Sequence, residues 1–80
     1  MDYIELVEKY KNYSIKELKE TLAKLNEKIK KANKEEKNIR LNEGLYTEAY
    51  KKEQYNKYAN LINEYYIARD IMFEKEEDNE

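Results

Sequence analysis

Residues 58–73, YANLINEYYIARDIMF, decide the fold, because no other stretch of the chain is as dense in apolar and aromatic residues. On a helix that turns about 100° per residue, they form two apolar stripes. The first stripe consists of Tyr58, Leu61, Tyr65, Ala68 and Met72. The second consists of Ile62, Tyr66 and Phe73 and extends backward through Ala59 and Tyr55. A helix that is apolar on two sides must be covered on both, by other parts of the chain or by a second chain.

The composition predicts an all-α fold in one domain, residues 1–80. The chain has one glycine and no proline, so it carries little turn chemistry between its apolar residues. With 80 residues and no cysteine or histidine, it has neither a disulfide nor a zinc site to reinforce its core. A core of this size supplies only about 3 to 5 kcal/mol of net stability.

A second long helix is predicted over residues 15–43, ahead of the deciding stretch. Ser14 and Glu17 match a capping box, and apolar residues follow in steps of four and three. These residues are Ile15, Leu18, Leu22, Leu25, Ile29, Ala32 and Ile39, with one polar break at Glu36. Gly44 is expected to end this helix in a left-handed conformation, and Thr47 to cap a helix over 47–75. Residues 76–80 are expected to be a frayed acidic tail.

Together these features predict an antiparallel two-helix hairpin, resembling a coiled coil, that turns at about residues 44–46. A turn there pairs residues whose numbers sum to about 90, and it places small Ala32 opposite large Tyr58. Asp2 can cap a short N-terminal helix over about 2–11. We expect this helix to lay Ile4, Val7 and Tyr10 on the second stripe, at Ile62, Tyr66 and Phe73.

The residues that support catalysis are few, and we expect no enzymatic activity, no metal and no cofactor. Histidine and cysteine are missing, and the carboxylates alternate with lysines as on a solvated helix face. The sequence starts MDYIELVEKY, which has no apolar segment of the kind that directs export, and no run is long enough to cross a membrane. We therefore expect a cytoplasmic protein that does not act at a membrane.

Tyrosine is the unusual feature: the chain has nine, with one phenylalanine and no tryptophan. Because tyrosine is enriched in interfaces, residues without cover in the hairpin are candidates for binding another protein. The predicted apolar anchors are Tyr46, Tyr50, Tyr55 and Ala59. The predicted charges at their rim are Arg40, Lys51 and Lys52.

The predicted function is non-enzymatic docking on a larger protein, as a regulator, adaptor or inhibitor. The many Lys, Asn, Ile and Tyr residues are encoded by AT-rich codons, so an inhibitor of a host enzyme encoded by a phage or mobile element is one form. A homodimer or larger helical bundle is one alternative. Nucleic-acid binding by residues 28–40, with a net charge of +4, is another, although a solvated helix face is the favoured interpretation of that segment.

Overall fold

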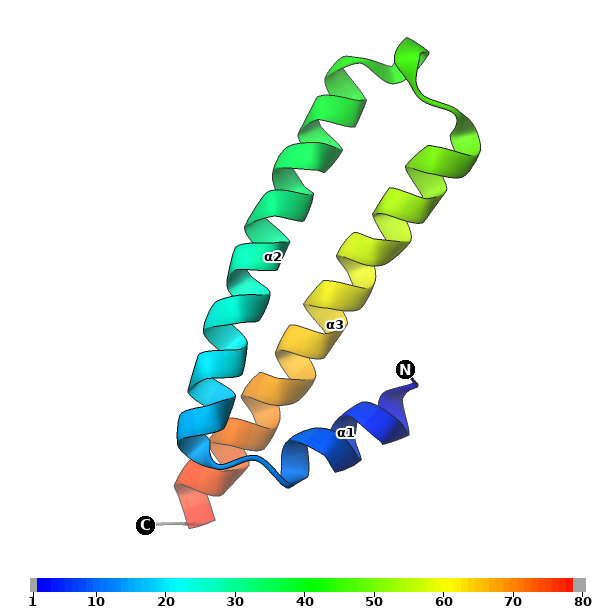
Figure 1. The fold of residues 1–80 in the computed structure, drawn as a ribbon. Coiled ribbons are helices and arrows are strands. Elements are labelled where there is room, and N and C mark those ends of the chain that lie inside the picture. Colours follow the sequence, from blue (N-terminus) through cyan, green and yellow to red (C-terminus); the bar gives the residue numbers. More distant parts are fainter. Residues whose placement is uncertain (1, 79–80) are drawn as a thin grey trace.

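The computed structural model describes residues 2–78 and confirms an all-α hairpin with a short N-terminal helix. Its elements are α1 (Tyr3–Lys11), α2 (Ile15–Leu41), the short 3-10 helix η1 (Glu43–Leu45) and α3 (Glu48–Asp78). The helices α2 and α3 run antiparallel, and α1 folds back beside the C-terminal half of α3 (Figure 1). The molecule is a rod of 53 × 21 × 14 Å.

Each helix begins at the capping residue that the sequence indicates. The Asp2 carboxylate accepts a hydrogen bond from the Glu5 amide at 2.9 Å. Both halves of the capping box are present, because the Ser14 hydroxyl and the Glu17 carboxylate each accept a bond of 3.1 Å from the other residue's amide. The Thr47 hydroxyl accepts from the Tyr50 amide at 3.1 Å. These bonds satisfy amides that the first helical turn leaves without partners.

The end of α2 differs from the prediction. The helix stops at Leu41, and the Asn42 side chain donates to the Asn38 carbonyl oxygen at 3.0 Å. Gly44 lies inside η1 with a negative φ, so the prediction that it adopts a left-handed conformation is wrong. The helix ends earlier because an asparagine side chain binds one of its last carbonyl groups.

Replacing Gly44 with alanine is expected to stabilise the protein by about 0.4 to 1 kcal/mol. A Cβ added there meets no atom within 4 Å, and the backbone needs no positive φ. Alanine then lowers the entropy of the unfolded chain without straining the folded one. Urea denaturation followed by helical circular dichroism measures the change, with Ala49→Gly in the exposed first turn of α3 as the converse control. Destabilisation by Gly44→Ala would show that the glycine is needed after all.

The predicted pairing of the two long helices agrees with the contacts between them. The Lys19 ammonium lies 3.9 Å from a Glu76 oxygen, and the Tyr50 hydroxyl donates to Glu35. The numbers of these pairs sum to 95 and 85, on either side of the expected 90. Leu18 and Met72, a pair that sums to 90, lie in the same core cluster. The turn therefore sets the register that the side-chain sizes predicted.

The acidic tail begins later than predicted. The helix α3 continues through Asp78, so Glu76, Glu77 and Asp78 are helical and not frayed. Residues 79–80 of the predicted tail lie outside the described residues.

The core lies at the end of the hairpin that is far from the turn, where all three helices meet. Its buried residues are Tyr10, Leu18, Ala68, Ile71 and Met72. Ile71 and its half-buried neighbour Ile67 belong to neither predicted stripe, yet these two residues lie toward α1. Their side of α3 provides the surface on which α1 packs.

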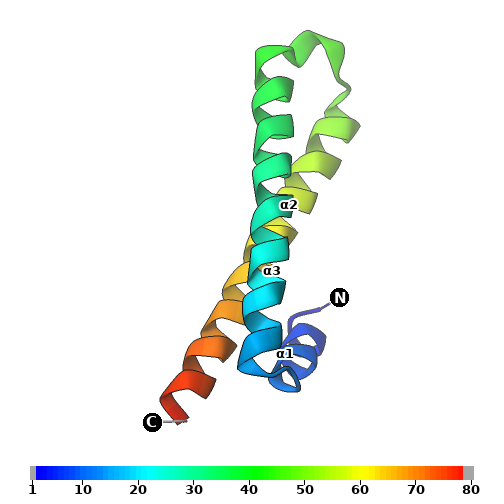
Figure 2. The same ribbon diagram turned by 60° about the vertical axis from the view of Figure 1, so that its left-hand side comes forward.

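The helix α1 therefore does not cover the second stripe, and that prediction is wrong. Tyr66 and Phe73 remain about half exposed, and Ile4 is 66 % exposed. The Tyr10 hydroxyl donates to the Glu64 carboxylate, and the Lys75 ammonium donates to the carbonyl oxygens of Lys11 and Tyr13. A cation at the C-terminal end of a helix stabilises its exposed carbonyl groups. These contacts hold α1 against α3. Figure 2 shows α1 beside the end of the hairpin that is far from the turn.

Candidate protein-binding surfaces

The seven predicted binding residues do not form one surface. Tyr46 and Tyr50 lie beside the turn, and Tyr55 and Ala59 lie further along α3. Arg40 is on α2, where its guanidinium lies 4.0 Å from the Glu36 carboxylate. Lys51 and Lys52 are in the first turns of α3, and the Lys51 ammonium lies 3.2 Å from Glu48. These residues divide between the turn and one side of α3.

Tyr46 and Tyr50 are partly occupied by contacts within the chain. Their rings stack at 5.2 Å with an angle of 12°, and both residues are half-buried. The Tyr50 hydroxyl donates to the Glu35 carboxylate at 3.2 Å, which joins α3 to α2. Partial burial and this hydrogen bond raise the pKa of Tyr50 above its usual value. The prediction that both tyrosines lack cover within the hairpin is therefore wrong.

The turn carries the least covered large apolar side chains of the described residues. Leu41 is 83 % exposed and Leu45 is 80 % exposed. We define the turn-end surface as these two leucines, the Tyr46 ring and the cations next to them on α2. Its residues are Lys34, Lys37, Arg40, Leu41, Leu45 and Tyr46. Neither leucine was predicted as a binding residue, because Leu41 stands two residues after Ile39 and so falls outside the predicted seam.

The basic segment 28–40 is more positive toward solvent than its sequence suggests. All six of its lysine and arginine residues are exposed. Its two carboxylates are half-buried and engaged within the chain, Glu35 with Tyr50 and Glu36 with Arg40. A shallow hollow on α2 places Lys31, Lys34 and Lys37 around Leu41. The turn-end surface therefore combines exposed leucines with exposed cations of α2, while exposed Glu43 and Glu48 add negative charge beside the turn.

A second uncovered surface follows α3 along the stripe that α1 leaves free. We call it the outer stripe, and it consists of Tyr55, Ala59, Ile62, Tyr66, Arg69 and Phe73. Its three aromatic residues are 47 to 58 % exposed. The Arg69 guanidinium carbon lies 4.6 Å from the centre of the Tyr66 ring and 5.8 Å from that of Phe73. Arg69 thus makes cation–π contacts with both the Tyr66 and the Phe73 rings.

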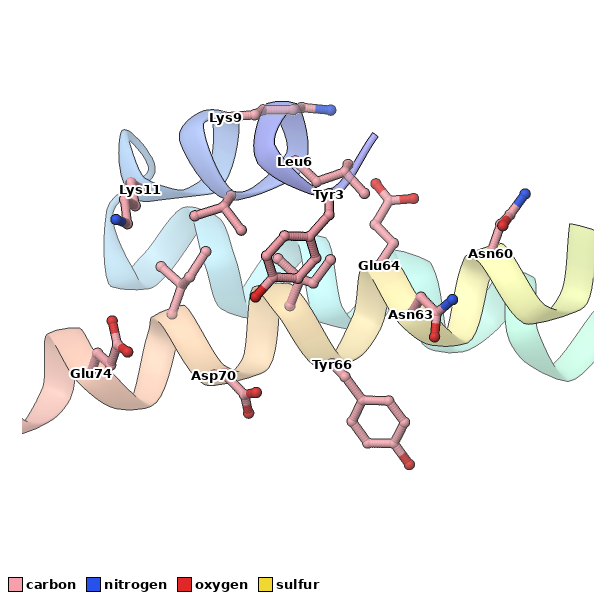
Figure 3. A pocket seen from close by; sticks show the side chains of 13 residues that line it. Tyr3, Leu6, Lys9, Lys11, Asn60, Asn63, Glu64, Tyr66, Asp70 and Glu74 are labelled. Carbon is pink, nitrogen blue, oxygen red and sulfur yellow. The ribbon is translucent and has the colours of Figure 1, made fainter. Parts of the chain in front are cut away.

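Tyr66 belongs to the outer stripe and also lies at the edge of the groove between α1 and α3 (Figure 3). Tyr66 points away from α1, whereas Tyr3 and Glu64 lie between the two helices. The groove between α1 and α3 contains Glu64, Asp70 and Glu74 with Lys9 and Lys11, so its charges are mixed. Burial and the hydrogen bond to Glu64 raise the pKa of Tyr10 well above its usual value. The residues of this groove mainly hold α1 against α3.

Among residues 2–78, no group of three or more His, Cys, Asp or Glu side chains is arranged to hold a metal ion. No helix in the same part of the chain is long and apolar enough to cross a membrane. Comparisons with protein-family models, with curated proteins and with solved structures found no match to this chain.

Proposed function

We propose that this protein is a small, non-enzymatic helical module that docks on a larger protein through the turn-end surface, as a regulator, adaptor or inhibitor. The observation that carries the proposal is the exposure of Leu41 and Leu45, at 83 and 80 %, beside a basic rim. Exposed apolar groups inside a polar rim are typical of protein interfaces. The basic rim favours a partner with an apolar pocket and acidic residues around it.

The residues of this surface differ in their expected contributions. Leu41 and Leu45 would enter the partner's pocket, because they have the most apolar area left to bury. Lys34, Lys37 and Arg40 would mainly set orientation and association rate, since exposed charge pairs contribute little affinity. Tyr46 has less area to offer, because its ring already stacks on Tyr50. An inhibitor of a host enzyme, encoded by a phage or mobile element, remains one form of this proposal.

Replacing Leu41 and Leu45 with serine is expected to weaken binding to the partner by at least about tenfold, from the apolar area that the pair loses. The measurement is affinity capture from a low-GC bacterial lysate, followed by titration of the captured protein with each variant. The matched control is Tyr3→Ser with Ile4→Ser, which removes two apolar residues, 69 and 66 % exposed, from α1. Retained binding by the leucine variant, or equal loss in the control, would contradict this assignment.

Nucleic-acid binding is the second candidate, and the six exposed cations of residues 28–40 favour it. Such binding would weaken steeply with salt, with a slope of about −0.9 for each phosphate contacted. It would also be lost in the variant Lys30→Glu, Lys34→Glu, Lys37→Glu. We place it second because two exposed leucines at the same end suit a protein pocket better than a phosphate backbone. Titration of a labelled DNA duplex with the wild type and with this triple variant separates nucleic-acid binding from protein binding.

A further inference from the structure

The outer stripe repeats as a coiled-coil seam does, with steps of four, three, four, three and four residues from Tyr55 to Phe73. At about 100° per residue, its centre lies about 100° around α3 from the line that faces α2. The helix α1 packs on the side of Ile67 and Ile71. Neither α1 nor α2 therefore fully covers this seam, which runs for about 27 Å along α3. Its aromatic residues are about half exposed, and Ala59, Ile62 and Arg69 are half-buried.

We propose that a second copy of this chain covers the outer stripe, with the two α3 helices antiparallel about a twofold axis near residue 64. In this arrangement, residues whose numbers sum to 128 face each other. Tyr55 meets Phe73 of the second copy, Ile62 meets its Tyr66, and small Ala59 meets its long Arg69. Aromatic residues meet aromatic ones and a small residue meets a large one, as close packing requires.

The charges at the ends of the stripe select the antiparallel orientation. The seam continues at Lys52 before Tyr55 and at Glu76 after Phe73, and these two residues also sum to 128. An antiparallel pair places each lysine against the glutamate of the other copy. A parallel pair would place lysine on lysine and glutamate on glutamate, which is unfavourable. Glu76 lies 3.9 Å from Lys19 in its own chain, a surface ion pair that contributes little and that a second copy's lysine can replace.

The flank of the seam and its central arginine are also compatible with a second copy. Flanking residues in this arrangement pair with an offset from the core, so that on the side away from α2 their numbers sum to 126. Asn63 then lies opposite Asn63 and Asn56 opposite Asp70, so amide groups can donate to their opposite residues. Arg69 lies 3.5 Å from the Asp70 carboxylate of its own chain. Its charge therefore enters the interface with a counter-ion, which reduces the cost of burying it.

The dimer would place two turn-end surfaces at opposite ends of one rod. Glu48, the first residue of α3, is 16 residues from the axis, so the two ends of the dimer would lie at least about 48 Å apart at 1.5 Å per residue. A partner that is itself repeated or oligomeric could then bind both ends, which raises the overall affinity. The dimer itself uses none of the turn-end residues, so it does not depend on the proposed function.

Sedimentation velocity of the full chain tests the dimer, from low micromolar to millimolar concentration. The wild type is expected to form a dimer, and Ile62→Glu with Tyr66→Glu is expected to weaken it at least about 30-fold. The matched control, Leu41→Glu with Leu45→Glu, should dimerise like the wild type while losing the larger partner. Circular dichroism checks that each variant is helical. A wild type that stays monomeric, or a helical seam variant that dimerises equally well, would overturn the proposal.

Thiol cross-linking tests the orientation with two variants that keep the apolar seam, Lys52→Cys and Glu76→Cys. The natural chain has no cysteine, so each variant carries a single thiol. A short bifunctional reagent should join the two variants to each other when they are mixed. It should join neither variant to itself, because like positions would be separated by about 36 Å along the antiparallel pair. Cross-linking of either variant to itself, or none in the mixture, would overturn the antiparallel dimer.

Discussion

Replacing Leu18 with alanine is expected to leave much of the protein unfolded at room temperature. Leu18 is completely buried in the cluster where α1, α2 and α3 meet. Removing a buried leucine side chain costs about 2.7 to 5 kcal/mol, because the lost transfer energy is added to that of a cavity. A chain of this length has a net stability of about 3 to 5 kcal/mol, so the loss removes most or all of it.

Urea denaturation monitored by circular dichroism measures the effect of Leu18→Ala. The matched control is Leu41→Ala, the same substitution at a residue that is 83 % exposed, which should change stability by less than about 0.5 kcal/mol. All variants are compared at one concentration, since a dimer adds stability that depends on it. If Leu18→Ala were as mild as Leu41→Ala, the three-helix junction could not be the main core.

Alkaline pH is expected to destabilise the protein through Tyr10. Its pKa is raised in the folded state, first by burial and then by its hydrogen bond to Glu64. Below about pH 10, the tyrosine is protonated in both folded and unfolded chains, and its contribution is fully present. Above that pH, the unfolded chain releases the proton while the folded chain retains it. Stability then falls by up to about 1.4 kcal/mol for each pH unit until the folded tyrosine also ionises.

The comparison variant for this pH dependence is Tyr10→Phe, which keeps the ring and removes the ionising group. Urea midpoints at a series of pH values from neutral to strongly alkaline should fall more steeply for the wild type, by about one proton in the slope. The other eight tyrosines and the lysines are the same in both proteins, so they contribute equally. Parallel pH profiles would show that Tyr10 does not hold its proton in the folded state.

The periodicity of apolar residues was insufficient to predict which surfaces of α3 stay exposed. The two stripes on residues 58–73 were identified, but which one α1 would cover was not. That choice depends on Glu64 and Lys75, whose contacts join residues 54 and 64 positions apart. A helical repeat reports which residues share a face and carries no information about such distant hydrogen bonds. The stripe expected to be covered therefore became the candidate dimer surface.

The candidate binding residues were also predicted only in part from the sequence. Tyr55 is 58 % exposed and Ala59 is half-buried, whereas Tyr46 and Tyr50 stack together and Tyr50 binds Glu35. Leu41 and Leu45 were missed because isolated leucines outside a heptad pattern carry no signal of their own. Their exposure depends on how the chain leaves α2, with Asn42 binding back to Asn38.

Local patterns in the sequence were sufficient to predict the helices and their N-terminal caps, because capping bonds and heptad spacing act over three to seven residues. The hairpin register followed from the position of the turn and from matching side-chain sizes. Only the tertiary structure decided the side of α3 on which α1 packs, the conformation of the turn and which aromatic residues stay exposed. These features depend on side chains such as Tyr10, Glu64 and Lys75 meeting across the molecule. Their energies are those of burial and pairing between distant residues, which no local pattern specifies.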